Sequence, residues 1–310
     1  YSESQITSII EKLRSHAPTL YPYLLEAVLY SIQTKLYQQM KVSEIKQGLE
    51  SIIKRSKSQK LSGLLHKTLG ALDLIIDKNL SWNNPYFWNF HSFDIYILPN
   101  VEYLFKKLRK YGYQYHILLP SKALELFIKY LSKTLTLYRI KRPSKKVIKS
   151  LKDYLRKKIE ELERYEEENL PKLLDESVKR IIEIYEKLKP IIENYLTYIE
   201  NIEIHAKKSL NDLENGDKKR RSPHDYYYEL LMINREKLQN AADMRNYIEG
   251  ILKMLYLVEI GKVSINEIMD SLYKNEDPLS NLKETHNLLL SKQRNLFDCE
   301  ITKKDWCTKR

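Results

Sequence analysis

Apolar residues recur at intervals of three and four positions through the second half of this 310-residue chain. Such spacing places them on one face of an α-helix, and its persistence over many turns is typical of a long helix that packs along a partner helix. A sandwich or barrel is disfavoured, because the chain has only seven glycines and ten prolines for tight turns. The pattern therefore predicts a mainly α, multi-helix protein. The apolar positions are Ile148, Leu151, Leu155, Ile159, Leu162, Leu174, Val178, Ile181, Tyr185, Leu188, Ile192, Tyr195, Ile199, Ile202, Ala206, Leu210 and Leu213.

Local signals mark both ends of this long helix. Pro143 and Ser144 are typical of a helix start, and Asn215-Gly216 supplies the left-handed residue that commonly ends a helix. Two further prolines lie inside the pattern, and each removes a backbone hydrogen bond. The apolar spacing keeps its phase across Pro190, which predicts a kink, and slips near Pro171, which predicts a break or a restart.

A second apolar series follows the long helix. We therefore expect the chain to turn back and to pack antiparallel on that helix, so that residues 139–260 form a long, kinked, basic helical hairpin. The positions are Tyr227, Leu231, Leu238, Ala241, Ile248, Leu252 and Leu255.

Cations crowd the start of the long helix, with Asp153 as the only nearby carboxylate, and six glutamates between Glu160 and Glu168 follow them. Cations near a helix N-terminus oppose the helix dipole, so helix stability does not explain their placement. A partner with phosphate groups is one explanation, and a solvated, thermophile-like surface is the other. The candidate contacts for nucleic acid are Arg139, Lys141, Arg142, Lys145, Lys146, Lys149, Lys152 and Arg156.

A second basic run lies in the connection between the two predicted helices, at Lys218, Lys219, Arg220 and Arg221. At the tip of a hairpin these side chains would be exposed and well placed to contact phosphates. The alternative is a solubilising loop.

The first half of the chain divides into two regions. Residues 1–92 are expected to form helices followed by an aromatic loop, NLSWNNPYFWNFHS, which either packs on the body or binds a partner. Residues 93–138 repeat a pattern of extended run, Leu-Pro, capping residue and amphipathic helix. This predicts a small βαβα insertion, or else extended links between helices, because two strands alone do not make a stable sheet.

The last region, 261–310, is expected to contain short helices and a basic tail. Ser264 and Glu267 form a capping box for a helix that runs to Tyr273. Asp277-Pro278 opens another helix.

Few chemical signatures accompany this architecture. The net charge of +12 and the pI near 9.3 favour an acidic partner such as nucleic acid. No phosphate-binding glycine loop, zinc-binding pair of histidines or serine elbow is present, so no catalytic residue, cofactor or metal is assigned. The two cysteines suit a reducing cytoplasm, and no apolar run reaches the length of a membrane span.

One segment carries a resemblance to a known family. PTLYPYLLEAVLYSIQTKLY, residues 18–37, together with the basic, helix-rich remainder, resembles the large subunit of archaeal type I-A CRISPR interference complexes. The resemblance implies a non-catalytic subunit of an RNA-guided antiviral assembly that contacts target DNA. A composition rich in Lys, Ile, Leu, Glu and Tyr also resembles proteins of crenarchaeal thermophiles or their viruses.

The sequence thus predicts a basic nucleic-acid-binding subunit of a larger complex, which contacts the phosphate backbone of DNA or RNA. The alternative is a helical adaptor whose long hairpin docks an acidic protein.

Overall fold

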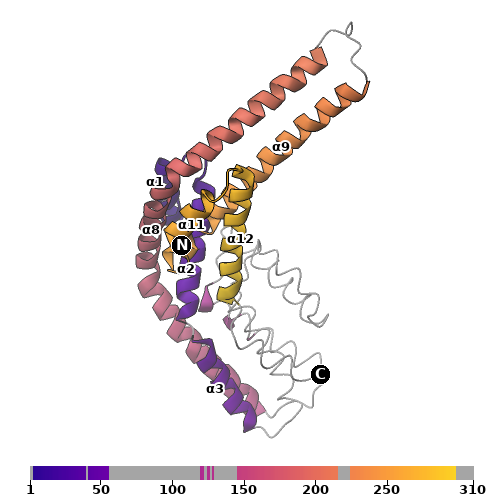
Figure 1. The fold of residues 1–310 in the computed structure, drawn as a ribbon. Helices are drawn as coiled ribbons and strands as arrows, with labels where there is room; N and C mark the ends of the chain where they lie inside the picture. Colours follow the sequence, from indigo (N-terminus) through magenta and orange to yellow (C-terminus); the bar gives the residue numbers. More distant parts are fainter. Residues whose placement is uncertain are drawn as a thin grey trace. The chain divides into compact units, whose positions relative to one another are not determined.

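A computed structural model describes residues 3–39, 41–55, 119–121, 124–125, 128, 145–215 and 224–297. Every regular element among them is a helix (Figure 1), which confirms the mainly α, multi-helix prediction. The chain divides into two compact units. One comprises Tyr1–Val28 with Glu176–Leu296, and the other comprises Leu29–Asp175 with Phe297–Arg310.

Several predicted segments lie outside the described residues. They are the aromatic loop, the two extended runs of the predicted βαβα insertion, the basic run at 218–221 and the C-terminal tail. Of the insertion, residues 120–121, 124–125 and 128 are helical, at the place where its second helix is predicted.

Helices α1, α2 and α3 lie within the first 55 residues, where helices were expected. Helix α1 (Glu3–His16) ends before Pro18, where a short turn leads into α2 (Tyr21–Gln38). Helix α3 (Val42–Lys54) follows. The apolar positions of α2 are almost fully buried, as shown by Leu24, Val28, Ile32 and Leu36.

The long helix, α8 (Lys145–Asn215), is continuous over 71 residues. Its predicted apolar face is confirmed, because most of the predicted positions are buried, from Leu151 to Ala206. The break predicted at Pro171 is wrong. Pro171 and Pro190 are both exposed, as are Glu167 and Glu186, whose carbonyls lose the proline N–H. Water can hydrogen-bond those carbonyls, so the helix continues. The kink at Pro190 remains a prediction.

The phase slip near Pro171 has its own cause. Glu166, which is 5% exposed, occupies the position on the buried face between Leu162 and Leu170. Because this position of the buried face holds a charged residue, the apolar series in the sequence is interrupted here.

Helix α9 (His224–Lys253) packs antiparallel on the second half of α8 (Figure 1). Asn234 Nδ2 donates to Ser209 Oγ at 3.2 Å, and further along Arg245 pairs with Glu203 at 3.1 Å. Later residues of α9 thus pair with earlier residues of α8, which confirms the predicted antiparallel arrangement.

Three helices complete the first unit: α10 (Tyr256–Glu259), α11 (Ile265–Leu272) and α12 (Pro278–Phe297). Gly261, with φ of 77°, makes the left-handed turn after α10. The predicted capping box opens α11: Glu267 N donates to Ser264 Oγ at 3.1 Å, and Ser264 N donates to Glu267 Oε2 at 2.7 Å.

Candidate functional site

The start of α8 presents its cations to solvent. Lys146, Lys149 and Arg156 are exposed and Lys152 is half-buried, whereas Leu151 and Leu155 on the opposite side of the helix are buried. We call Lys146, Lys149, Lys152 and Arg156 the basic face. Within the part of the chain that the structure describes, the three lysines have no carboxylate within ion-pair distance, and Arg156 reaches Asp153 only at 4.0 Å.

Lys158, at the end of this run, differs from the basic face. Its Nζ donates to Glu161 Oε2 at 2.7 Å, and this bond raises the pKa of Lys158. Lys158 is therefore already paired within the chain, and it is not a candidate contact for a partner.

Packing against α3 fixes the opposite side of α8. The Tyr154 hydroxyl donates to the carbonyl of Glu44 at 3.2 Å. The same ring lies against Gly48, where any side chain would force the phenol ring of Tyr154 to move. Ile45 and Leu49 of α3 are also buried. One side of α8 therefore packs on α3, and the basic face lies on another side, where it is accessible to solvent.

The other predicted contacts are not positioned by the structure. Arg139, Lys141 and Arg142, and the basic run Lys218, Lys219, Arg220 and Arg221, lie outside the described residues. Lys145 belongs to α8, but its side chain is not among those described.

Glu166 has a role that the sequence did not indicate. Its carboxylate accepts from Ser121 N at 2.8 Å and from Ser121 Oγ at 2.5 Å. Burial, followed by the charge of Glu166, raises the pKa of Tyr37. Of the six glutamates between Glu160 and Glu168, Glu166 therefore does not face solvent, because it holds the helical turn at Ser121 inside the second unit.

A hollow of ≈ 480 Å³ lies in the first unit, between α8, α9 and the start of α12. Its apolar lining includes Ile202, Leu279 and Met244, of which Met244 is 1% exposed. Polar groups on its rim include His205 and Lys237. Sequence reasoning did not find this hollow, because its lining comes from three segments that are far apart in the chain.

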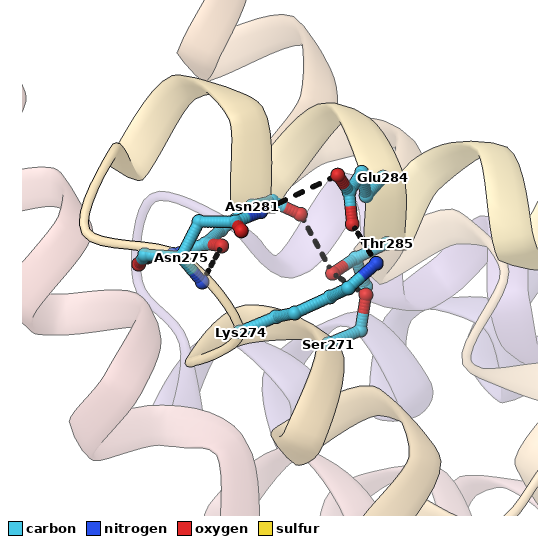
Figure 2. Close-up of polar contacts among 6 residues, drawn as sticks. All are labelled: Ser271, Lys274, Asn275, Asn281, Glu284 and Thr285. Carbon is cyan, nitrogen blue, oxygen red and sulfur yellow. Dashed lines mark hydrogen bonds and ion pairs between the residues drawn. The ribbon is translucent and has the colours of Figure 1, made fainter.

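The connection from α11 to α12, which forms one wall of the hollow, is held by a polar network (Figure 2). The side chain of Asn281 accepts from Asn275 N at 2.8 Å and donates to the Asn275 carbonyl at 2.7 Å. Lys274 pairs with Glu284 at 2.8 Å, and the Thr285 hydroxyl donates to the Asn281 carbonyl at 2.8 Å. This wall is therefore preorganised.

Among the described residues, no group of three metal-ligating side chains comes together. No helix in the same residues combines the length and the hydropathy needed to cross a bilayer. Comparison with protein-family models, with curated proteins and with solved structures finds no match to this chain. Function is therefore inferred from side-chain geometry and charge.

Proposed function

We propose that this chain binds the sugar–phosphate backbone of nucleic acid through the basic face of α8, as a subunit of a larger assembly. The supporting observation is that exposed Lys146 and Lys149 and half-buried Lys152 have no carboxylate partner in the described part of the chain. Lys146, in the first turn of α8, also opposes the helix dipole, so the helix does not account for its placement. A polyanion is the partner that such a surface favours.

The dimensions of the basic face suit a phosphate backbone. Lys146 and Arg156 are ten residues apart, which is roughly 15 Å along a helix and corresponds to roughly four base-pair steps. Successive lysines three positions apart are rotated by about 60°, so Lys146, Lys149 and Lys152 spread over an arc of about 120°. Lysines on a smooth helix surface read no base edges, so binding is expected to be sequence-tolerant.

The test is a triple variant, Lys146→Gln, Lys149→Gln and Lys152→Gln, which keeps good helix formers at all three positions. The matched control replaces Lys179, Lys187 and Lys208, three exposed lysines elsewhere on α8, with Gln. Both variants lose the same net charge, so only the placement of the charge differs.

Fluorescence anisotropy over a range of KCl concentrations, with labelled duplex DNA, single-stranded DNA and RNA of one sequence, gives the affinity and its salt slope. We expect the log–log slope of the first variant to shrink by up to about 0.9 per lost duplex contact, or about 0.7 for a single strand. The control should keep the parental slope. Equal losses in both variants, or no loss in the first, would reject the proposal.

An adaptor role is the second candidate, and exposed apolar residues on the hairpin favour it. Ile204 is 61% exposed, Tyr228 58% and Met232 47%, although all three are large and apolar. An acidic protein could dock on the hairpin, where these apolar side chains would add buried area. Under this reading, labelled nucleic acid binds the parent and the triple variant equally weakly.

A role in RNA-guided antiviral interference rests on the resemblance of residues 18–37. Their apolar positions lie in the protein core, so this likeness concerns packing more directly than contacts with DNA. Purification of the chain from its native host, followed by sequencing of the bound nucleic acid and identification of the bound proteins, tests this proposal. Guide RNA in the purified assembly is the expected result.

A further inference from the structure

The hollow between α8, α9 and α12 has two chemically different ends. On α8, His205 follows Tyr198 by seven residues, and on antiparallel α9, Lys237 precedes Met244 by seven. Seven residues are two turns, or roughly 10 Å. His205 and Lys237 therefore lie at one end of the hollow, and Tyr198 and Met244 lie at the other.

The α11–α12 connection contributes to the lining through Asp277, and it is anchored to α8 beside the apolar end. Tyr195, one turn before Tyr198, donates its hydroxyl to the carbonyl of Leu272 at 2.6 Å, where this connection begins. Leu279, just beyond the connection, lines the hollow. The apolar end is thus a formed surface made by three segments, with Met244 as its most deeply buried member.

The charges in the hollow are also arranged unequally. Asp277 lines it too, but its carboxylate accepts from Leu279 N at 3.3 Å, Ser280 N at 3.1 Å and Ser280 Oγ at 2.5 Å. Its charge is therefore engaged by the first turn of α12. Lys237 and His205, by contrast, have no hydrogen-bond or ion-pair partner within the described part of the chain.

We propose that this hollow binds a small organic carboxylate with a planar or short aliphatic apolar body. The carboxylate lies at Lys237 and His205, and the apolar body covers Ile202 and Leu279 next to the buried Met244. The volume lies in the range of ligand pockets, which are typically apolar with a few polar groups that fix orientation. A phosphodiester backbone does not fit this lining, because it has no apolar body to place on the buried methionine. The site is independent of the basic face of α8.

Methionine methyl signals provide a direct probe of binding. The chain contains five methionines, so a full-length sample labelled with ¹³C at the methionine methyl groups gives a simple spectrum. Met244→Leu assigns the signal of Met244, the one methionine that lines the hollow. The ligands are naphthalene-2-acetate and its uncharged amide, naphthalene-2-acetamide, which has the same apolar body.

We expect the carboxylate to move the Met244 signal saturably and to leave the Met254 and Met269 signals in place. A charge-assisted hydrogen bond is expected to make the carboxylate bind about tenfold more tightly than the amide. Lys237→Gln should remove that difference and leave the affinity for the amide unchanged. Lys208→Gln, an exposed lysine of α8 outside the lining, is the control and should behave like the parent.

Three results would overturn this proposal. The first is a Met244 signal that neither ligand moves. The second is equal affinity for carboxylate and amide in the parent, and the third is an unchanged preference for the carboxylate in Lys237→Gln. Because Lys237 is exposed, its replacement is not expected to unfold the protein, and a thermal melt monitored by circular dichroism checks this.

Discussion

At Gly250, α9 passes so close to His286 of α12 that any side chain at position 250 would require the imidazole to move. A Cβ atom built on Gly250 would lie 2.5 Å from both Cδ2 and Nε2 of the imidazole. Tyr247, one turn earlier on α9, packs on the same imidazole with ring centroids 5.4 Å apart. The glycine therefore sets the distance between the two helices, although glycine inside a helix normally costs about 0.5–1 kcal/mol relative to alanine.

Replacing Gly250 with alanine tests this contact. At an open helical site the change would stabilise the protein, but here we expect a loss of about 1–3 kcal/mol in the free energy of unfolding, because the methyl group overpacks the interface. Urea denaturation measures the change. In a His286→Ala background the same substitution should be neutral or stabilising. A stabilising effect in the parent would show that the imidazole moves aside without cost.

His286 also predicts a dependence of stability on pH. Burial lowers the pKa of His286 from its usual 6.5. Between the lowered value and the unfolded value, the unfolded chain binds more protons, so stability rises with pH. The contribution is complete above about pH 6.5 and is lost as the pH falls below it. We expect the parent to lose stability relative to His286→Gln on acidification, as measured by urea unfolding at several pH values. Parallel curves would contradict this.

Single residues also show where sequence reasoning ends. The exposure of Lys149 and Arg156 follows from their helical spacing relative to Leu151 and Leu155, so the sequence predicted it. The burial of Glu166 could not be found in that way. Its partner, Ser121, is 45 positions away, and within an acidic run a glutamate has the same local pattern whether it is solvated or buried.

Among the helices, boundaries set by local hydrogen bonds were predicted well. The capping box at Ser264 and the start of α12 after Asp277 need only residues within one turn. The helix break predicted at Pro171 was wrong because the cost of a missing hydrogen bond depends on whether solvent reaches the freed carbonyl. Local sequence does not contain that information. The hollow was missed for a similar reason, since it depends on how α8, α9 and α12 meet.

The capping box at the start of α11 predicts how much Ser264 contributes to the stability of the protein. Ser264→Ala removes one of the two reciprocal bonds of the capping box, so we expect a loss of about 1 kcal/mol in the free energy of unfolding. Ser264→Asp, another good cap, should retain most of the stability. Ser291→Ala, at an exposed position inside α12, is the control and should change stability by less than about 0.5 kcal/mol. Equal effects at both serines in urea denaturation would argue against the cap.

For the whole molecule, net charge and local charge lead to different expectations about how the affinity for DNA changes with pH. The chain carries +12 at neutral pH and has a pI near 9.3. Lysine and arginine side chains as a class stay protonated at that pH, so a basic surface can keep its local charge after the net charge of a protein has disappeared. We expect the affinity for duplex DNA, measured by anisotropy at constant salt, to fall by less than about tenfold between neutral pH and the pI. Complete loss at the pI would show that net charge governs binding.

The division of the chain into units has a practical consequence for genetics. One unit is assembled from Tyr1–Val28 and Glu176–Leu296, so neither terminal half of the chain contains it. A truncation that begins at residue 176 removes α1, along with the His16 side chain that lies 2.9 Å from Glu186. A truncated chain would therefore expose side chains that are buried in the intact unit. If such a fragment lost an activity, the cause would be misfolding, and the loss would not locate a site. Only point substitutions at exposed positions can assign an activity to a region of this protein.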